Sequence, residues 1–277
     1  MENLRSQAEA YQRYLEREER SDATRSQYRR DIVGFLSFLG SRALSKDAAI
    51  EYKQELQRNH RPTSVNTKLA ALNGFFVFLG KGDLRLKLLK IQRRSYSSVE
   101  RELSKAEYLR LVRTAERQDD ARLSLLLQTI CGTGIRVSEL RYITEEAVRR
   151  GEAHIRAKGK NRTILLPQKL RKSLGKYTRR EGIASGPVFV TRTGRPLDRS
   201  NVWKMMKALC HAAGVAEGKV FPHNLRHLFA RTFYALDKDI SKLADILGHS
   251  NINTTRIYII TTGQEHRRCL DALGLVI

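Results

Sequence analysis

Residues 223–258 read HNLRHLFARTFYALDKDISKLADILGHSNINTTRIY, and this stretch holds the side chains from which the rest of the chain is interpreted. It supplies a guanidinium at Arg226, imidazoles at His223 and His249, and a phenol at Tyr258. The apolar run that begins at Phe229 predicts helix between these groups. A basic set of side chains with a hydroxyl nucleophile, and without an obvious set of metal ligands, suggests chemistry on a phosphodiester.

The charge balance of the whole chain favours a polyanionic partner. Lys and Arg number 52 and Asp and Glu 29 among 277 residues, which gives a net charge of +23 and a pI of about 10.3. Both the first hundred residues and the remainder carry the excess, so the positive field is not confined to a tail. Such a field attracts nucleic acid or an anionic membrane surface.

Other bulk features narrow the class of protein. The sequence has no run of 18 apolar residues and no apolar segment after Met1, so neither a membrane span nor a signal peptide is expected, and the predicted location is cytoplasmic. Cys131, Cys210 and Cys269 lie far apart, which predicts free thiols rather than disulfides or a zinc site. No cofactor is indicated.

The N-terminal part has the pattern of a compact all-α domain over residues 1–80. Apolar spacing predicts four helices with short connections, at about 4–20, 22–39, 46–59 and 62–79. Ser21 is placed to cap the second helix, Pro62 to open the fourth, and Gly40 and Gly80 to end the second and fourth. Residues 81–101 lose this periodicity and gain Ser, Lys and Arg, which predicts a linker.

Residues 102–277 mix helix and strand signals and predict an α+β domain, so the chain is mainly α with a small β-sheet. Ser104 and Glu107 have the spacing of a capping box. A helix over 122–131 is followed by the break at 132–134, and Arg136 is predicted to lie in the first turn of the next helix. Alternating residues over 152–167 predict two strands around a turn at 158–161, and 187–190 predicts another short strand.

Each candidate motif also has an ordinary interpretation. Gly132-Thr133-Gly134 lacks the Gly-Lys-Ser/Thr of a phosphate-binding P-loop, although its glycines allow a tight turn. His223 and His227 are four residues apart, as in a zinc pair, but Asn224 stands where a metalloprotease needs Glu, so no metal is expected. Arg226 alone could be a solvated charge, and Tyr258 alone a core residue.

Taken in order, the motifs resemble the tyrosine recombinase (phage integrase) family, in its Xer-like branch. They are Arg136 in Gly-x-Gly-x-Arg-x-Ser-Glu-Leu, a lysine in a β-turn, His-x-x-Arg-His, Leu-Gly-His, and Tyr258 nine residues after His249. The resemblance covers nearly the whole chain. It implies a SAM-like core-binding domain, in which the stretch from Ser64 to Leu69 lies in the fourth helix, and a C-terminal catalytic domain.

The resemblance also implies a role for each matching residue. Tyr258 would attack a phosphodiester of double-stranded DNA, leaving a 3′-phosphotyrosyl enzyme and a free 5′-hydroxyl. Arg136 and Arg226 would hold the non-bridging oxygens, His223 would assist proton transfer, and His249 would hydrogen-bond the phosphate. Neither ATP nor a metal is required by this scheme.

The hairpin leaves two lysines as candidates for the general acid. Lys158 directly precedes Gly159, as the family pattern has it, and is therefore preferred to Lys160 for protonating the leaving 5′-oxygen. Further contacts with the DNA backbone are expected from basic residues of both domains and the linker: Lys160, Arg162, Lys68, Arg93 and Arg94.

The expected activity is site-specific recombination, in integration, excision, inversion or dimer resolution. An additional arm-type DNA-binding domain is not expected at this length, which favours a Xer-like, invertase-like or small mobile-element enzyme. A monomer that becomes a homotetramer on paired sites is expected, with the apolar segment after Gln264 docked on a neighbouring protomer, or alternatively on its own subunit. The alternatives are a catalytically inactive DNA-binding protein on the same fold and a type IB topoisomerase-like relaxing enzyme.

Overall fold

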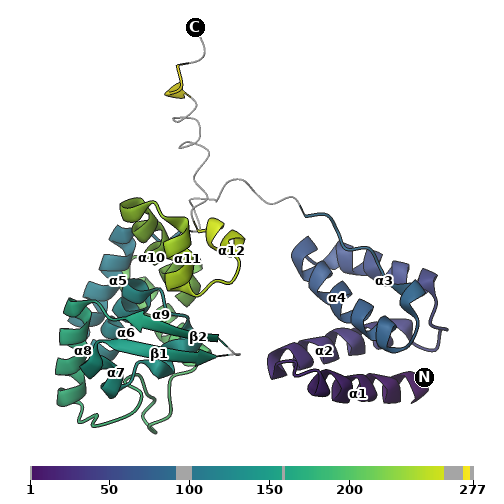
Figure 1. Cartoon of the computed structure of the whole chain (residues 1–277), viewed down its shortest axis with the longest axis horizontal. Helices are drawn as coiled ribbons and strands as arrows, with labels where there is room; N and C mark the ends of the chain where they lie inside the picture. The colour runs from purple at the N-terminus through teal and green to yellow at the C-terminus, as the bar shows by residue number, and fades with distance from the viewer. Residues whose placement is uncertain (1, 92–101, 158–159, 259–270, 275–277) are drawn as a thin grey trace. The chain divides into compact units, whose positions relative to one another are not determined.

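The computed structural model describes residues 2–91, 102–157, 160–258 and 271–274, and the chain divides into two compact units. The N-terminal unit covers Met1–Arg93 and the C-terminal unit Arg94–Ile277. Most described residues are helical, and the described strands form one two-stranded sheet (Figure 1). No helix within the described ranges is long and apolar enough to cross a membrane.

The N-terminal unit consists of four helices and one short 3-10 turn. They are α1 (Glu2–Arg17), α2 (Asp22–Leu39), α3 (Lys46–Asn59), α4 (Pro62–Phe78) and η1 (Gly82–Leu84). Ser21 and Ser45 accept hydrogen bonds from backbone N–H groups in the first turns of α2 and α3, which satisfies donors that a helix start leaves open. Pro62 occupies the first position of α4, where its missing N–H costs nothing.

The core of this unit is aromatic and aliphatic. Phe35, Phe75 and Phe76 are fully buried where α2 and α4 pack together. Two asparagines of α4 fix the segment that follows it: the side chain of Asn73 bonds both backbone groups of Leu86, and that of Asn66 both groups of Leu89. The end of the unit is therefore fastened to α4 before the chain leaves it.

The C-terminal unit surrounds one large core. Its helices are α5 (Lys105–Arg117), α6 (Ala121–Thr133), α7 (Glu145–Arg150), α8 (Gln168–Arg180), α9 (Arg199–Ala213), α10 (Pro222–Asp237), α11 (Ile240–Leu247) and α12 (Ile252–Arg256), with 3-10 turns η3 (Val137–Tyr142) and η4 (Glu217–Lys219). Helix α6 packs against α5, α8 and α10, and Leu126, Leu127 and Ile130 on it are fully buried. The predicted capping box of Ser104 and Glu107 is present at the start of α5.

The sheet is an antiparallel hairpin of β1 (Glu152–Ala157) and β2 (Lys160–Leu165). Its register pairs Glu152 with Leu165 at the open end and Ala157 with Lys160 next to the turn. Ala153, Ile155 and Ile164 face the core, as the alternation predicted. Residues 158–159, which connect the two strands, lie outside the described ranges.

Three local predictions were wrong. Arg136 is not inside a first helical turn but directly precedes η3, a 3-10 rather than an α-helix. Residues 187–190 form only isolated bridges, Thr144 with Pro187 and Val190 with Pro196, because each pair includes a proline that lacks a backbone donor. The apolar run from Phe229 to Leu247 is two helices, divided at Lys238, whose φ is +57°.

Candidate active site

Arg226 is the buried centre of the site. It lies in the first turns of α10 and is 2% exposed, and besides a side-chain hydrogen bond with Tyr258 its guanidinium donates to three acceptors. Nη1 bonds the carbonyl of Gly134, and Nη2 bonds the carbonyl of Leu247 at 2.8 Å and Nε2 of His249 at 2.8 Å. Burial, and then the charge of Arg136, lower its pKa to about 10, with Tyr258 acting in the opposite sense, so the group remains charged at neutral pH.

Gly134 shapes the approach to this guanidinium. It ends α6 in the left-handed conformation with φ +64°, and a Cβ there would lie 2.5 Å from the ring of Phe229. A side chain at this position would therefore both strain the backbone and displace α10. The glycine that the sequence suggested for a tight turn also allows its carbonyl to meet Arg226.

Arg136 presents a second guanidinium at the end of the same turn. Glu139 holds it from both sides, because its carboxylate accepts from the backbone N of Arg136 at 2.9 Å and from Nη1 at 3.1 Å. The Arg136 side chain is 41% exposed, whereas that of Glu139 is 8% exposed. The carboxylate therefore anchors the arginine from inside and leaves part of its fork open.

Arg162 of β2 ties three segments of the site together. Its Nη2 donates to Glu139 at 2.5 Å and its Nη1 to the carbonyl of Ile246 at 2.6 Å, at the end of α11. Burial opposes the charge on Glu139, but the hydrogen bond from the Arg136 backbone and the charges of Arg162 and Arg136 outweigh it, so the pKa of Glu139 is lowered. Only 13% of the Arg162 side chain is exposed.

His249 follows the end of α11 and is fixed at both ring nitrogens. Nε2 meets Arg226, and Nδ1 lies 2.8 Å from Oγ1 of Thr255. Gly248 before it has φ +64°, and a Cβ there would lie 2.5 Å from Cδ of Arg162. The Leu-Gly-His sequence thus lets the chain turn closely over Arg162 and return toward α10.

Tyr258 lies among three imidazoles. It is 3% exposed, and its ring centroid lies 4.3 Å from that of His227, 5.6 Å from His249 and 5.8 Å from His223. The His249 and Tyr258 rings are nearly parallel, at 12°, whereas His227 meets Tyr258 edge to face. The phenol is therefore enclosed next to Arg226, among residues that follow Arg136 by 87 to 122 positions in the sequence.

The imidazoles of the site are neutral at pH 7. Burial, followed by neighbouring positive charge, lowers the pKa of His249 to about 4, and burial followed by His223 and Arg226 lowers that of His227 to about 4. Burial and Arg226 also lower the pKa of His223. A neutral imidazole can accept a proton, which an imidazolium cannot.

The structure describes only some of the other residues that were predicted to act on DNA. Lys158, Arg93 and Arg94 lie outside the described residues, and only the backbone of Lys160 is described. Lys68 bonds the buried carboxylate of Asp31 at 3.0 Å within the N-terminal unit.

Sequence reasoning missed Glu139, His227 and Thr255 as members of the site. For His227 a signal was present, because its spacing of four from His223 places both on one helix face. Arg162 was expected on the DNA backbone, and in the structure its guanidinium bonds the carbonyl of Ile246 and the carboxylate of Glu139. No sequence pattern pointed to Glu139 or Thr255, because folding brings their partners close. Arg162 lies 23 positions from Glu139, and His249 lies across a turn from Thr255.

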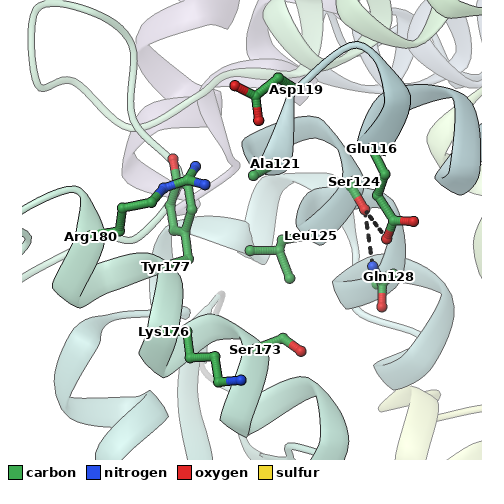
Figure 2. Close-up of a pocket in the computed structure, with 10 residues that line it drawn as sticks. All are labelled: Glu116, Asp119, Ala121, Ser124, Leu125, Gln128, Ser173, Lys176, Tyr177 and Arg180. Carbon is green, nitrogen blue, oxygen red and sulfur yellow. Dashed lines mark hydrogen bonds between the residues drawn. The ribbon is translucent and has the colours of Figure 1, made fainter.

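The site is separate from the pocket that Figure 2 shows, and among the described residues it forms no metal-ligand cluster. Within the described residues, no three or more His, Cys, Asp or Glu side chains are grouped so as to hold a metal ion. The cavity in Figure 2, of about 360 Å³, is lined by parts of α5, α6 and α8 that include Glu116, Gln128 and Tyr177. None of the arginines, histidines and tyrosine described above lines it.

Both units of the chain match models of known protein families. Residues 101–265 match the model of the phage integrase family, and residues 8–81 match that of the phage integrase N-terminal SAM-like domain. The tyrosine recombinase XerA of Pyrococcus furiosus is 29% identical over 283 residues, which cover 99% of this chain and 96% of that protein.

Solved structures agree with this result. A crystal structure of XerA recombinase aligns with a TM-score of 0.55 at 26% identity and covers 99% of each chain. A lambda integrase tetramer bound to a Holliday junction aligns with a TM-score of 0.72 at 18% identity, covering 92% of this chain and 76% of that one, which shows a shared fold. With a family model matched over more than half of its residues, this chain belongs to the phage integrase family.

Proposed function

We propose that this protein is a site-specific DNA recombinase in which Tyr258 is the nucleophile. The phenolic oxygen of Tyr258 forms a bond to the phosphorus of a DNA phosphodiester, and the bond from phosphorus to the 5′-oxygen breaks. The phenolic proton passes to a neighbouring base, and the leaving 5′-oxygen takes up a proton. Attack by the 5′-hydroxyl of another strand then reverses these steps and rejoins the DNA, so the phosphate bond is conserved without ATP.

The observation that carries this proposal is the surplus of positive charge next to the phenol. Arg136, Arg162 and Arg226 are coupled to one another electrostatically, and one carboxylate, that of Glu139, neutralises one of the three charges. Two charges remain in this cluster, which we name the arginine cluster: Arg136, Glu139, Arg162 and Arg226. A phosphoryl transition state carries about two negative charges on its oxygens, and fixed guanidinium groups stabilise such charge by about 3–4 kcal/mol per donor.

Arg136 and Arg226 differ in exposure, and we assign them different roles for that reason. Arg226 is held rigidly by Gly134, Leu247 and His249, while the more open fork of Arg136 is the first to meet an incoming phosphate. Because Arg226 and Tyr258 are 2% and 3% exposed, DNA must displace protein groups from them before attack. A phosphate oxygen then takes the place of the phenol beside Arg226.

Proton transfer is assigned to groups on opposite sides of the phosphorus. His223 accepts the phenolic proton, supported by its position near Tyr258 and by the lowered pKa that keeps it neutral. Lys158 donates to the 5′-oxygen, supported by the family pattern, in which the lysine directly precedes a glycine. Separate replacement of Lys158 and Lys160 by Ala decides between them: if only Lys160→Ala abolishes cleavage, and a 5′-thiolate leaving group rescues it, the assignment to Lys158 is wrong.

The test of the chemistry is covalent capture. DNA from the regions flanking the gene is nicked near each candidate site, so that the cleaved end diffuses away and the enzyme remains attached. A protein–DNA adduct on a denaturing gel, absent with Tyr258→Phe, is the expected result. If the wild-type chain binds these duplexes but forms no adduct on any of them, the inactive DNA-binding alternative replaces the proposal.

The topoisomerase-like alternative is distinguished by sequence dependence. A relaxing enzyme removes supercoils from any plasmid, whereas a recombinase forms adducts at one position and yields recombinant products from two sites. The same wild-type preparation is assayed on plasmids with and without the captured site. Equal relaxation of both plasmids would favour the topoisomerase-like activity.

We further propose that the chain is a monomer in solution and a homotetramer on two paired sites, acting in the cytoplasm on double-stranded DNA. A lambda integrase tetramer of the same fold bound to a Holliday junction supports this assembly. The segment from Gln264 onward lies largely outside the described residues, and we assign to it docking between protomers. Its deletion is expected to weaken paired-site complexes in a gel-shift titration more than binding to one half-site, and equal loss of both would contradict the assignment.

A further inference from the structure

Thr255 is linked to the arginine cluster through His249. It is the fully buried residue of α12, the short helix that Asn251 caps through its side chain. Its Oγ1 lies 2.8 Å from Nδ1 of His249, and the other ring nitrogen, Nε2, lies 2.8 Å from Nη2 of Arg226. A threonine, an imidazole and a guanidinium therefore form a continuous hydrogen-bonded chain that ends on the buried arginine.

The chemistry of these groups fixes the proton positions in this chain. A guanidinium has five N–H donors and no acceptor, so Nε2 of His249 must be the acceptor in its contact with Arg226. The ring is neutral at pH 7, because burial and Arg226 lower its pKa to about 4, and its single proton is therefore on Nδ1. That proton is donated to Oγ1 of Thr255, which is within hydrogen-bonding distance.

We infer that Thr255 is a positioning residue that selects the Nδ1–H tautomer of His249 and thereby makes Nε2 an acceptor that orients Arg226. With the proton on Nε2, two donors would face each other across the contact between His249 and Arg226, and the guanidinium would turn away. The tautomer does not depend on the proposed function. Its effect on DNA cleavage does, because that effect acts through the role of Arg226 at the phosphate.

This arrangement gives His249 a role in the DNA-free protein that differs from the hydrogen bond to the phosphate implied by the resemblance. An unprotonated Nε2 cannot donate to a phosphate oxygen, so that later bond requires Nε2 to take up a proton when DNA binds. Nη2 of Arg226 has two hydrogens, of which one goes to the carbonyl of Leu247 and the other to His249, while Nη1 bonds the carbonyl of Gly134. Three acceptors on two segments, the turn that ends α6 and the turn that ends α11, together with the hydrogen bond with Tyr258, thus fix the plane of the guanidinium. A fixed plane avoids reorganisation when charge develops on the phosphate, which is the source of electrostatic catalysis.

The tautomer is read directly by NMR of the full chain labelled with ¹⁵N-histidine. The chain has seven histidines, and the signals that disappear in His249→Gln assign this ring. Wild-type protein is expected to show His249 with a protonated Nδ1 and an unprotonated Nε2 at pH 7. Thr255→Val keeps the shape of the side chain but removes the acceptor, and is expected to change this pattern to a mixture of tautomers.

Activity and two further variants separate positioning from packing. Thr255→Val should slow adduct formation on a nicked substrate roughly tenfold, the effect of one lost neutral hydrogen bond. Thr255→Ser retains a hydroxyl and should restore both the tautomer and the rate. Thr254→Val is the matched control, since Thr254 lies on the same helix with an exposed side chain, and its histidine spectrum should equal that of the wild type.

Three results would overturn the inference: a wild-type His249 with a proton on Nε2 or on both nitrogens, an unchanged tautomer in Thr255→Val, or a changed tautomer with an unchanged cleavage rate. Failure of the proposed function looks different. In that case the wild-type chain forms no adduct, while the tautomers of the wild type and of Thr255→Val differ as expected.

Discussion

Among the residues that the structure describes, each unit buries a carboxylate beside basic side chains, and the two surroundings differ. In the N-terminal unit, Asp31 is 2% exposed and bonds one lysine, Lys68, at 3.0 Å, and the amide of Gln27 at 2.9 Å. In the C-terminal unit, Glu139 is 6% exposed and holds two arginines, with the guanidinium of Arg226 nearby. The first group is electrically balanced, whereas the second carries two uncompensated positive charges.

This difference separates a structural ion pair from a binding site. Removing charge from water costs several kcal/mol per ion unless an opposite charge and hydrogen bonds offset it. The pair of Asp31 and Lys68 meets that condition within the protein. The arginine cluster meets it only when an anion arrives, which is the condition expected of a site for a phosphodiester.

The largest expected effect comes from removing the nucleophile beside the surplus charge. Tyr258→Phe keeps the ring among its imidazoles but removes the attacking oxygen, so adduct formation should fall by on the order of 10⁴-fold or more. Binding to the same duplex should change little, because the arginine cluster is intact. Adduct formation by Tyr258→Phe at a tenth of the wild-type rate would show that another group attacks.

A smaller loss is expected when the buried guanidinium is replaced with the charge retained. Arg226→Lys cannot reach Gly134, Leu247 and His249 together with a single ammonium, so the geometry of the phosphate clamp is lost. We expect adduct formation to fall by roughly 10²- to 10³-fold. Arg150→Lys, at the end of α7 on the exposed surface, is the control and should react like the wild type; a comparable loss there would show that net charge alone matters.

The balance of charge is tested more directly by neutralising each carboxylate in turn. Glu139→Gln leaves three guanidinium groups without a carboxylate, so the C-terminal unit should unfold at lower temperature and recover when millimolar sulfate binds the cluster. Asp31→Asn leaves a single, partly exposed lysine, and its cost of about 1–3 kcal/mol should not be recovered by sulfate. Thermal unfolding in sulfate and in sodium chloride of equal ionic strength is the measurement, and equal recovery of both variants would remove the distinction between the units.

The N-terminal half of the fold could be predicted because its signals are local. The helix starts depended on side chains next to the first turn, as at Ser45 and Pro62, and the helix ends on residues such as Gly40. The hairpin was likewise predictable, since the alternation over β1 and β2 fixes which residues face the core. These features depend on neighbours within about four residues.

The candidate site could be predicted only in part, because its geometry is made by contacts far apart in sequence. Arg136 and Arg226 were identified by pattern, but the pattern gave no sign that Arg162 would bond Ile246, 84 positions later, or would share Glu139 with Arg136. Arg162 was expected on the DNA backbone as a basic residue of the hairpin. In the structure, Arg162 bonds the buried carboxylate of Glu139 and lies directly against Gly248.

The smallest expected effect is the loss of stability at acid pH, and it too should differ between the two units. The pKa values of His227 and His249 are lowered to about 4 in the folded protein, from an ordinary value of about 6.5. Between these values the unfolded chain binds protons that the folded chain does not, so stability is fully present above pH 6.5 and is lost as the pH falls toward 4. The slope is less than about 1.4 kcal/mol per pH unit for each ring, because both remain partly accessible to water.

The single tryptophan, Trp203 on α9, allows this loss to be followed in the C-terminal unit by fluorescence. The unfolding temperature should decrease between pH 6.5 and 4.5, and His227→Asn should make that decrease shallower even if it lowers the starting value. His60→Asn, on the exposed end of α3 in the N-terminal unit, should leave the slope unchanged. The opposite result would be a pH dependence of the unfolding temperature that changes with His60→Asn and not with His227→Asn. In that case, protonation of the imidazoles around Tyr258 would not cause the loss of stability in acid, and the electrostatic difference between the two units would need another explanation.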